Sequence, residues 1–129
     1  MKLISKEWLD RAKDDLDVID EIVHRAQLTN MVAFHSQQAV EKMYKSIIEE
    51  FEVDFIKTHK LEILNEAVKK VVNFNVDIEM LKRLDEVYLN ARYPSDLGLL
   101  PYGKPSSEDA NRFYDYARTM YNNVLKMLE

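Results

Sequence analysis

Apolar residues along this chain recur at alternating steps of three and four, the spacing that gathers side chains on one side of an α-helix. The first run lies within residues 6–27, with Ser5 as candidate N-cap and apolar positions at Leu9, Ala12, Leu16, Ile19, Val23 and Ala26. The second run, capped by Thr29 or Asn30, extends to about Glu52 and has a wider apolar stripe. We therefore expect two long helices, the second of which is central to the core.

The pattern predicts two further helices before residue 94. Thr58 is the candidate N-cap of a third helix that reaches Val68. Asp77 opens a fourth helix, which should stop at about Tyr93 because Pro94 disfavours helical geometry in the residue before it.

Every helix-breaking residue, two glycines and three prolines, lies between Pro94 and Pro105, in a loop long enough to be functional. Ser106 and Asp109 then form a capping-box-like start to a fifth helix. Breakers are absent elsewhere, and no segment alternates with a period of two. We therefore predict an all-α chain, a single-domain, up-and-down bundle of about five helices over residues 1–129.

Composition narrows the classes of function. The chain has 129 residues, a net charge of −5 at pH 7 and no cysteine, which removes disulfides, thiolate metal sites and cysteine nucleophiles. The acidic balance argues against a general nucleic-acid binder. No apolar run approaches the roughly 20 residues of a membrane span, and no signal peptide is visible, so we expect a cytoplasmic protein without membrane contact. No metal-ligand spacing or cofactor motif is present, so no metal and no cofactor is expected.

A polar cluster opens the apolar stripe of the second helix, in the stretch FHSQQAVEKMYKSII. Helical spacing places Gln38, Glu41 and Lys45 along one edge and His35 and Lys42 along the adjoining edge. Glu41 and Lys45 also form a favourable i, i+4 ion pair. From spacing alone this cluster is either a solvated helix face with one salt bridge or one wall of a binding site.

Two further groups are candidates. Asp85, Tyr88 and Arg92 share one face of the fourth helix, and Arg92 lies at its C-terminus beside the glycine and proline loop. Arg92 either interacts with the helix dipole and caps the last carbonyls, or offers its guanidinium to a phosphate or carboxylate. His59, at the start of the third helix, is either a structural residue or a ligand contact.

Three segments in this order, HSQQAVEKMYKSII, KTHKLEIL and LNARYPSD, resemble the HEPN domain family, a helical domain of higher eukaryotes and prokaryotes. The resemblance extends over nearly the whole chain. It implies an up-and-down helical bundle, nucleotide binding, frequent homodimers and partnership with a small separate nucleotidyltransferase subunit. The residues that match the family's motifs are Gln38, Glu41, Lys42, Lys45, Thr58, His59, Arg92, Tyr93 and Pro94.

One departure affects the activity that the resemblance implies. Many HEPN proteins resemble metal-independent ribonucleases in which Arg is followed, after four to six residues, by His. Here no histidine follows Arg92, so a ribonuclease needs His35 or His59 to reach Arg92 through the fold. The same absence removes the Arg-x-x-x-x-His-x-Tyr form linked to toxin neutralisation.

The resemblance and its departure leave three functions open. The first is a non-catalytic nucleotide-binding subunit that assists a small nucleotidyltransferase in a toxin–antitoxin type of pair. The second is a divergent metal-independent ribonuclease toxin that acts on RNA, and the third is a structural homodimerisation module. We favour the first, in which the chain is not an enzyme and has no catalytic residue. The expected ligand contacts are His35, Gln38, Lys42, Lys45, His59, Asp85, Arg92 and Tyr93.

Overall fold

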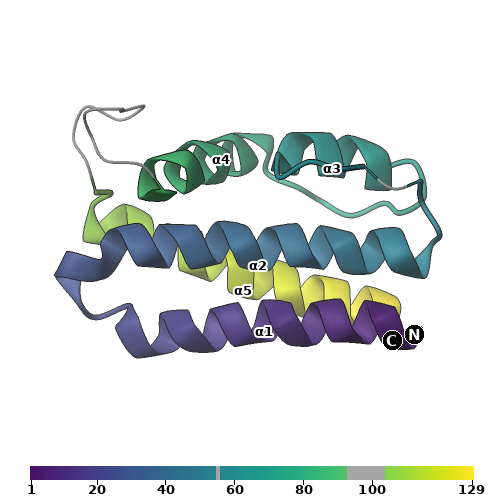
Figure 1. The fold of residues 1–129 in the computed structure, drawn as a ribbon, viewed down its shortest axis with the longest axis horizontal. Helices are drawn as coiled ribbons and strands as arrows, with labels where there is room; N and C mark the ends of the chain where they lie inside the picture. The colour runs from purple at the N-terminus through teal and green to yellow at the C-terminus, as the bar shows by residue number, and fades with distance from the viewer. Residues whose placement is uncertain (55, 93–103) are drawn as a thin grey trace.

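The chain folds into a bundle of α-helices (Figure 1). The computed structural model describes residues 1–54, 56–92 and 104–129, and these contain five α-helices and one short 3₁₀ helix but no strand. In chain order the helices are α1 (Leu3–Ile22), η1 (Ala26–Leu28), α2 (Thr29–Glu50), α3 (Leu61–Val68), α4 (Ile78–Arg92) and α5 (Ser107–Leu128). The predicted all-α bundle of about five helices is confirmed. Within these ranges, none of the helices has an apolar stretch long enough to cross a lipid bilayer.

α2 is the central helix and contacts all four of the others. In the view of Figure 1, α1 runs antiparallel along one side of α2, α5 passes behind it, and α3 and α4 cover the side opposite α1. α3 and α4 follow one another along a single line, so together they take the place of one long helix in an arrangement like a four-helix bundle. One face of α2 therefore lies between α1 and the α3–α4 layer, on the side away from α5.

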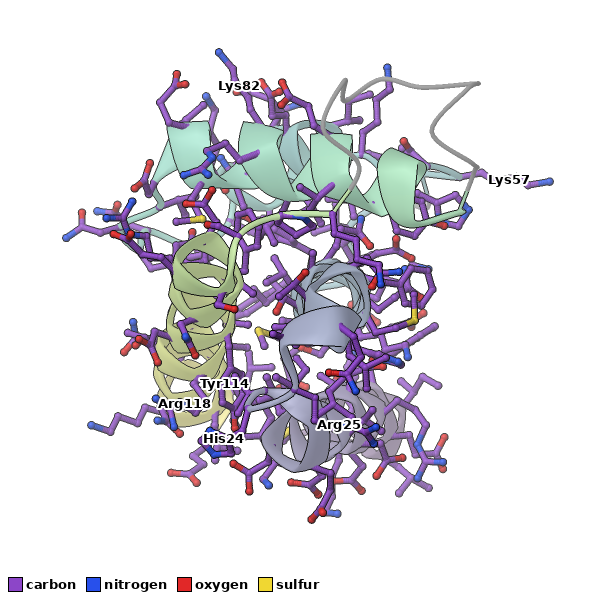
Figure 2. All side chains as sticks on the ribbon, turned by 90° about the vertical axis from the view of Figure 1, so that its left-hand side faces the viewer. His24, Arg25, Lys57, Lys82, Tyr114 and Arg118 are labelled. Carbon is purple, nitrogen blue, oxygen red and sulfur yellow. The ribbon has the colours of Figure 1, made fainter. Side chains whose placement is uncertain are left out.

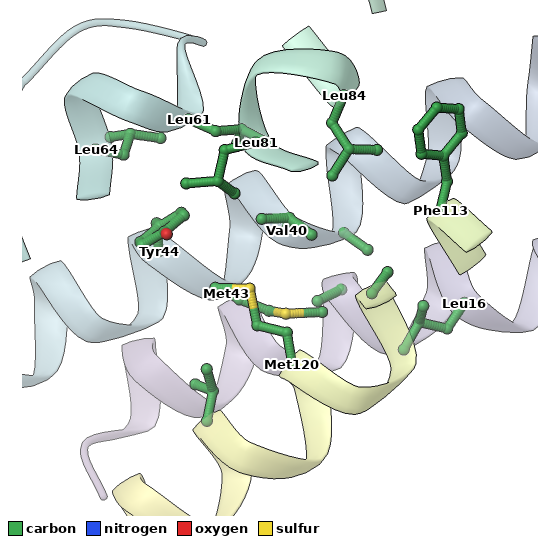
Figure 3. Close-up of a cluster of buried hydrophobic side chains, with 14 of the residues drawn as sticks. Leu16, Val40, Met43, Tyr44, Leu61, Leu64, Leu81, Leu84, Phe113 and Met120 are labelled. Carbon is green, nitrogen blue, oxygen red and sulfur yellow. The ribbon is translucent and has the colours of Figure 1, made fainter. Parts of the chain in front are cut away.

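α2 also supplies the centre of the hydrophobic core (Figure 3). Its Val40, Met43 and Tyr44 are fully buried. The Tyr44 hydroxyl donates a hydrogen bond to Asn65 Oδ1 at 2.9 Å, and burial raises the pKa of this phenol. The other labelled side chains of this core are Leu16, Leu61, Leu64, Leu81, Leu84, Phe113 and Met120. The wide apolar stripe predicted a central second helix, and this prediction is confirmed.

Two predicted helix caps are present. Ser106 Oγ accepts a hydrogen bond from the Asp109 amide at 3.0 Å, and Asp77 Oδ1 accepts one from the Met80 amide at 3.2 Å. Each side chain satisfies an amide of the first turn that has no helical carbonyl to bind. The predicted loop at 94–105 lies almost wholly outside the described residues, which resume at 104.

The predicted bounds of the first helix are wrong at both ends. α1 begins at Leu3, and Ser5 is fully buried within the helix instead of capping it. The reason is that Ser5 lies four residues before Leu9 and so belongs to the buried face. The helix ends at Ile22 rather than near Gln27, because the chain turns there into the 3₁₀ helix.

The N-terminus of α3 is capped from another helix, so the predicted Thr58 cap is wrong. Thr58 Oγ1 instead accepts a hydrogen bond from the Lys60 amide at 3.1 Å and closes a local turn. The helix begins at Leu61, whose amide donates to the Asp85 carboxylate of α4 at 3.0 Å. The Asp85 carboxylate of α4 therefore caps α3, the role that the sequence predicts for the Thr58 hydroxyl.

α2 ends at Glu50, two residues before the predicted end, in a Schellman motif. The Val53 amide donates to the Ile48 carbonyl at 2.9 Å, and the Glu52 amide donates to the Glu49 carbonyl at 3.4 Å. Glu52 has a φ of 54°, the left-handed region in which glycine is favoured. This helix end is therefore held by hydrogen bonds but carries backbone strain at one glutamate.

Candidate functional site

One face of α2 carries polar side chains between α1 and the α3–α4 layer. We call it the polar face of α2, and it consists of His35, Gln38, Glu41, Lys42 and Lys45. Helical spacing places all five within one half of the helix circumference. Each forms a hydrogen bond or ion pair with another side chain, so the polar face is a connected structure and not a row of separately solvated groups.

The first cluster on this face is centred on Asp15 of α1. The Asp15 side chain is only 10% exposed, and its two oxygens bind two residues of α2. Lys42 Nζ donates to Oδ2 at 2.7 Å, and His35 Nδ1 lies 2.8 Å from Oδ1. A carboxylate withdrawn from water needs such partners, because an unpaired buried charge costs several kcal/mol. We call these three residues the Asp15 cluster.

The second cluster is centred on Glu41, whose side chain is only 4% exposed. Lys45 Nζ donates to Glu41 Oε2 at 2.9 Å, and His59 Nδ1 lies 3.1 Å from Oε1. The His59 side chain is 64% exposed, so the ring projects into solvent from a buried anchor. Lys45 Nζ also lies 5.0 Å from the centroid of the Trp8 ring on α1, within range of a cation–π interaction. We call Glu41, Lys45 and His59 the Glu41 cluster.

Aromatic rings connect the two clusters. Phe34 meets the His35 ring edge-on at a centroid distance of 5.3 Å, and it stacks on Tyr88 of α4 at 5.5 Å. The His59 ring lies 6.0 Å from the same Tyr88. The two histidines, far apart in sequence, are therefore joined through Phe34 and the buried Tyr88 in one series of ring contacts.

Two glutamines position the backbone of the second cluster. Gln37 is fully buried, and its Nε2 donates to the His59 carbonyl at 2.9 Å. Gln38 Nε2 donates to Gln37 Oε1 at 2.9 Å. Gln38, predicted as a ligand contact, thus acts in this structure by orienting Gln37, which in turn holds the segment that carries His59.

The Asp85 carboxylate caps the N-terminus of α3. Burial raises the pKa of its carboxyl, while hydrogen bonds from the Leu61 amide, the Gln37 side chain and the Glu62 amide act in the opposite direction. Because the Asp85 carboxylate accepts hydrogen bonds from several amide groups, its main role is to cap the helix. Its link to Gln37 nevertheless ties α4 to the Glu41 cluster.

The two clusters together carry two carboxylates and two lysines, so their formal charge is zero while both imidazoles are neutral. Each imidazole that takes up a proton adds one positive charge. In both clusters Nδ1 faces the carboxylate, which leaves Nε2 as the ring nitrogen for a ligand or a transferred proton. The arrangement can hold an anion between fixed cations.

The side of the bundle away from α5 carries a further cation. Figure 2 shows Lys57, two residues before His59, projecting on this side, whereas Tyr114 and Arg118 belong to α5. The third histidine, His24, follows α1 and is separate from both clusters. Across the described ranges, no group of three or more His, Asp or Glu residues is arranged to hold a metal ion.

Comparison with known proteins decides the family. The sequence matches the profile of the HEPN domain over residues 5–127. The chain belongs to the HEPN domain family. The crystal structure of ST0689, an archaeal HEPN homologue, superimposes on this fold with a TM-score of 0.69 at 19% sequence identity, over 100% of both chains. This likeness supports the HEPN fold, and no curated protein sequence matches the chain.

The structure of this HEPN chain brings together most of the predicted contact residues. His35, Lys42, Lys45 and His59 all pair with the two buried carboxylates, and Gln38 acts through Gln37. Arg92 is the last residue of α4, but its side chain lies outside what the structure describes, as does the whole of Tyr93. The expectation that Arg92 contacts the same ligand as the polar face of α2 stays a prediction.

Sequence reasoning missed the carboxylate that organises half of this HEPN site. Asp15 is one of several acidic residues in α1 and looks like part of a solvated face. A signal was nevertheless present, because Asp15 follows Ala12 by three residues and precedes Ile19 by four, so it lies on the buried side of the helix. An acid in that register requires a partner, and Lys42 and His35 provide it. For Glu41 the sequence predicts the ion pair with Lys45 and a match to the family's motif, but not the contact with His59.

Proposed function

We propose that this HEPN chain is a non-catalytic subunit that binds the phosphate group of a nucleotide on the polar face of α2 and assists a small nucleotidyltransferase. The observation that carries the proposal is the pairing of two lysines and two histidines with two buried carboxylates on one helix face. The carboxylates fix the positions of the cations, so little side-chain entropy is lost when an anion binds.

The donors available on this face fit a phosphate. A lysine ammonium has three N–H donors. Lys42 and Lys45 each use one in a hydrogen bond to a side chain among the described residues. Hydrogen bonds between charged donors and phosphate oxygens are about twice as strong as neutral ones. Two lysines therefore offer charge-assisted hydrogen bonds to a phosphate, and each imidazole Nε2 can add one only when the ring carries a proton on both nitrogens.

The test is calorimetric titration of the protein with ribose 5-phosphate and with nucleoside monophosphates. Lys42→Gln and Lys45→Gln should each lower the affinity by about tenfold, the effect of one charge-assisted contact. Lys82→Gln is the matched control, because Lys82 is an exposed lysine of α4 that also pairs with a carboxylate, Glu79 at 3.6 Å. No binding of any phosphate compound by the folded protein contradicts the proposal.

The partner and the assembly belong to the same proposal and rest on the family's properties. The chain would form a homodimer in the cytoplasm and pair with a small nucleotidyltransferase in a toxin–antitoxin type of system. Co-purification of the two proteins, with sedimentation analysis of each alone and of the mixture, tests both statements. A monomer that forms no complex with the nucleotidyltransferase contradicts them.

A second candidate function, a metal-independent ribonuclease, is favoured by one specific observation. His59 Nδ1 is held by the buried Glu41, while the ring is largely exposed. A general base needs this kind of orientation, with its other nitrogen free to take the proton of a ribose 2′-hydroxyl. Cleavage of cellular RNA that disappears in both His59→Gln and Arg92→Ala, but persists in His24→Gln, would support this function. Cleavage that survives the first two substitutions excludes this site.

A further inference from the structure

A hollow of about 220 Å³ opens beside the Glu41 cluster, between α1, α2 and the segment that precedes α3. Its lining residues are Trp8, Lys45, Ile48, Glu49 and Ile56. Lys45 belongs both to this lining and to the polar face of α2. The hollow is therefore adjacent to the proposed phosphate site, and Lys45 is common to both.

The size and lining of the hollow suit one flat ring system. Pockets for drug-sized molecules enclose about 300–1,000 Å³, so this smaller hollow fits a part of a nucleotide rather than all of it. Trp8, Ile48 and Ile56 provide apolar walls from three different segments of the chain. A nucleobase contacts such walls favourably through the faces of its ring, whatever the identity of the base.

Charge decides which part of a nucleotide enters the hollow. Glu49 contributes to the lining, and its carboxylate disfavours a phosphate there. Lys45 precedes Glu49 by one helical turn and is tied to the Glu41 cluster, where His59 projects into solvent. We therefore place the neutral base in the hollow, against its apolar walls. The phosphate then lies between Lys45 and His59, away from the carboxylate of Glu49.

We propose that this hollow is a nucleobase subsite, in which the base of a nucleoside monophosphate lies against the Trp8 indole while Lys45 and His59 hold its phosphate. The subsite rests on the proposed function, because it takes phosphate binding on the polar face of α2 as given. It adds the part of the protein that distinguishes a nucleotide from a sugar phosphate.

The experiment compares adenosine 5′-monophosphate with ribose 5-phosphate on the full chain. Trp8 is the single tryptophan, so any change in tryptophan fluorescence arises at this residue of the hollow. We expect the nucleotide to bind about tenfold tighter than the sugar phosphate, since base–aromatic contacts in proteins contribute about that factor or more. We also expect the nucleotide to change the fluorescence of Trp8 more than the sugar phosphate does, because a phosphate on Lys45, 5.0 Å from the Trp8 ring, can affect the indole without a base.

Two variants separate the base from the phosphate. Trp8→Ala should remove the preference for the nucleotide, so that the ratio of the affinities for the nucleotide and for ribose 5-phosphate falls to about one; this ratio is the measure because loss of the Trp8–Lys45 contact also affects phosphate binding itself. Ile56→Thr makes a wall of the hollow polar and removes one methyl group from it, and it should lower nucleotide affinity without changing the affinity for ribose 5-phosphate. The second variant keeps the test informative if Trp8→Ala does not fold, which circular dichroism will show.

The two proposals fail in different ways. Equal affinity for the two ligands overturns the base subsite and leaves the phosphate site standing. The base subsite is equally overturned if the folded Trp8→Ala protein keeps the preference for the nucleotide. Absence of binding by both ligands overturns the proposed function, and the base subsite with it.

Discussion

At the scale of single residues, the two buried carboxylates are the structural basis of the candidate site. Asp15 and Glu41 each hold one lysine and one histidine, and both are almost completely withdrawn from water. Removing either carboxylate would leave a cation and an imidazole without their partner at the protein surface. The site and the stability of the bundle therefore depend on the same two side chains.

We predict that Asp15→Ala lowers the free energy of unfolding by about 2 kcal/mol, since charged hydrogen bonds that end on a buried carboxylate are lost. Asp17→Ala is the matched control on the same helix, because Asp17 pairs with Lys13 but is 62% exposed. It should change stability by less than about 0.5 kcal/mol, as exposed ion pairs do. Urea denaturation of the three proteins measures both values, and equal effects of the two substitutions would contradict the prediction.

Asp85 gives a second prediction, about pH. Burial raises the pKa of its carboxyl above the value of 3.8 that it has when unfolded. Between these two pKa values the folded state binds the proton and the unfolded state releases it, so the contribution of Asp85 to stability falls as the pH rises. Asp85→Asn cannot titrate and lacks this slope.

Denaturation of both proteins from about pH 3 to about pH 6 should show the wild type losing stability relative to Asp85→Asn as the pH increases. Asn keeps an oxygen for the Leu61 amide, so the cap is largely retained in the variant. A constant difference between the two proteins across this range would show that the carboxyl is not affected by its burial.

At the scale of secondary-structure elements, the end of α2 offers a test of backbone strain. Glu52 adopts a left-handed conformation that costs a residue with a Cβ atom about 1 kcal/mol or more. We expect Glu52→Gly to stabilise the protein by up to about 1 kcal/mol, the gain being reduced by the greater freedom of glycine in the unfolded chain. Glu52→Ala is the control, because it removes the same carboxylate and its ion pair with Lys2 but keeps the Cβ atom. Thermal unfolding should rank Gly above Ala, and the reverse order would exclude strain at this position.

Helix ends also show how far the sequence could predict this fold. The caps by Ser106 and Asp77 lie within three residues of the amides they bind, so local sequence was sufficient. The cap of α3 comes from Asp85, which is 24 residues away from Leu61 in sequence, and only the packing of α4 against α3 brings it there. Periodicity identified all five helices because burial of an apolar stripe is a local pattern.

The candidate site was predictable to a similar degree. The spacing of His35, Lys42 and Lys45 on one face of α2 was visible in the sequence, and the structure confirms that they share it. Lys45 pairs with Glu41 of the same helix. Lys42, in contrast, pairs with Asp15 of α1, and His59 reaches Glu41 from the segment before α3. The pairing of cations with buried carboxylates is a tertiary property, and no periodicity of one helix contains it.

At the scale of the whole molecule, the negative net charge of the protein repels the anionic ligand that we propose. The chain carries a net charge of −5, so an anion is repelled at long range and attracted only near the polar face of α2.

The two ends of the chain lie together at one end of the bundle (Figure 1). There the Lys2 amide donates to Glu50 at 2.8 Å, close in sequence to the Ile48 and Glu49 that line the hollow beside Trp8. A purification tag at either terminus would therefore crowd the same surface, and ligand affinities are best measured after its removal. The same proximity makes the protein a good subject for cyclisation, since a short peptide joining the last residue to the first would close the backbone and restrict the unfolded chain.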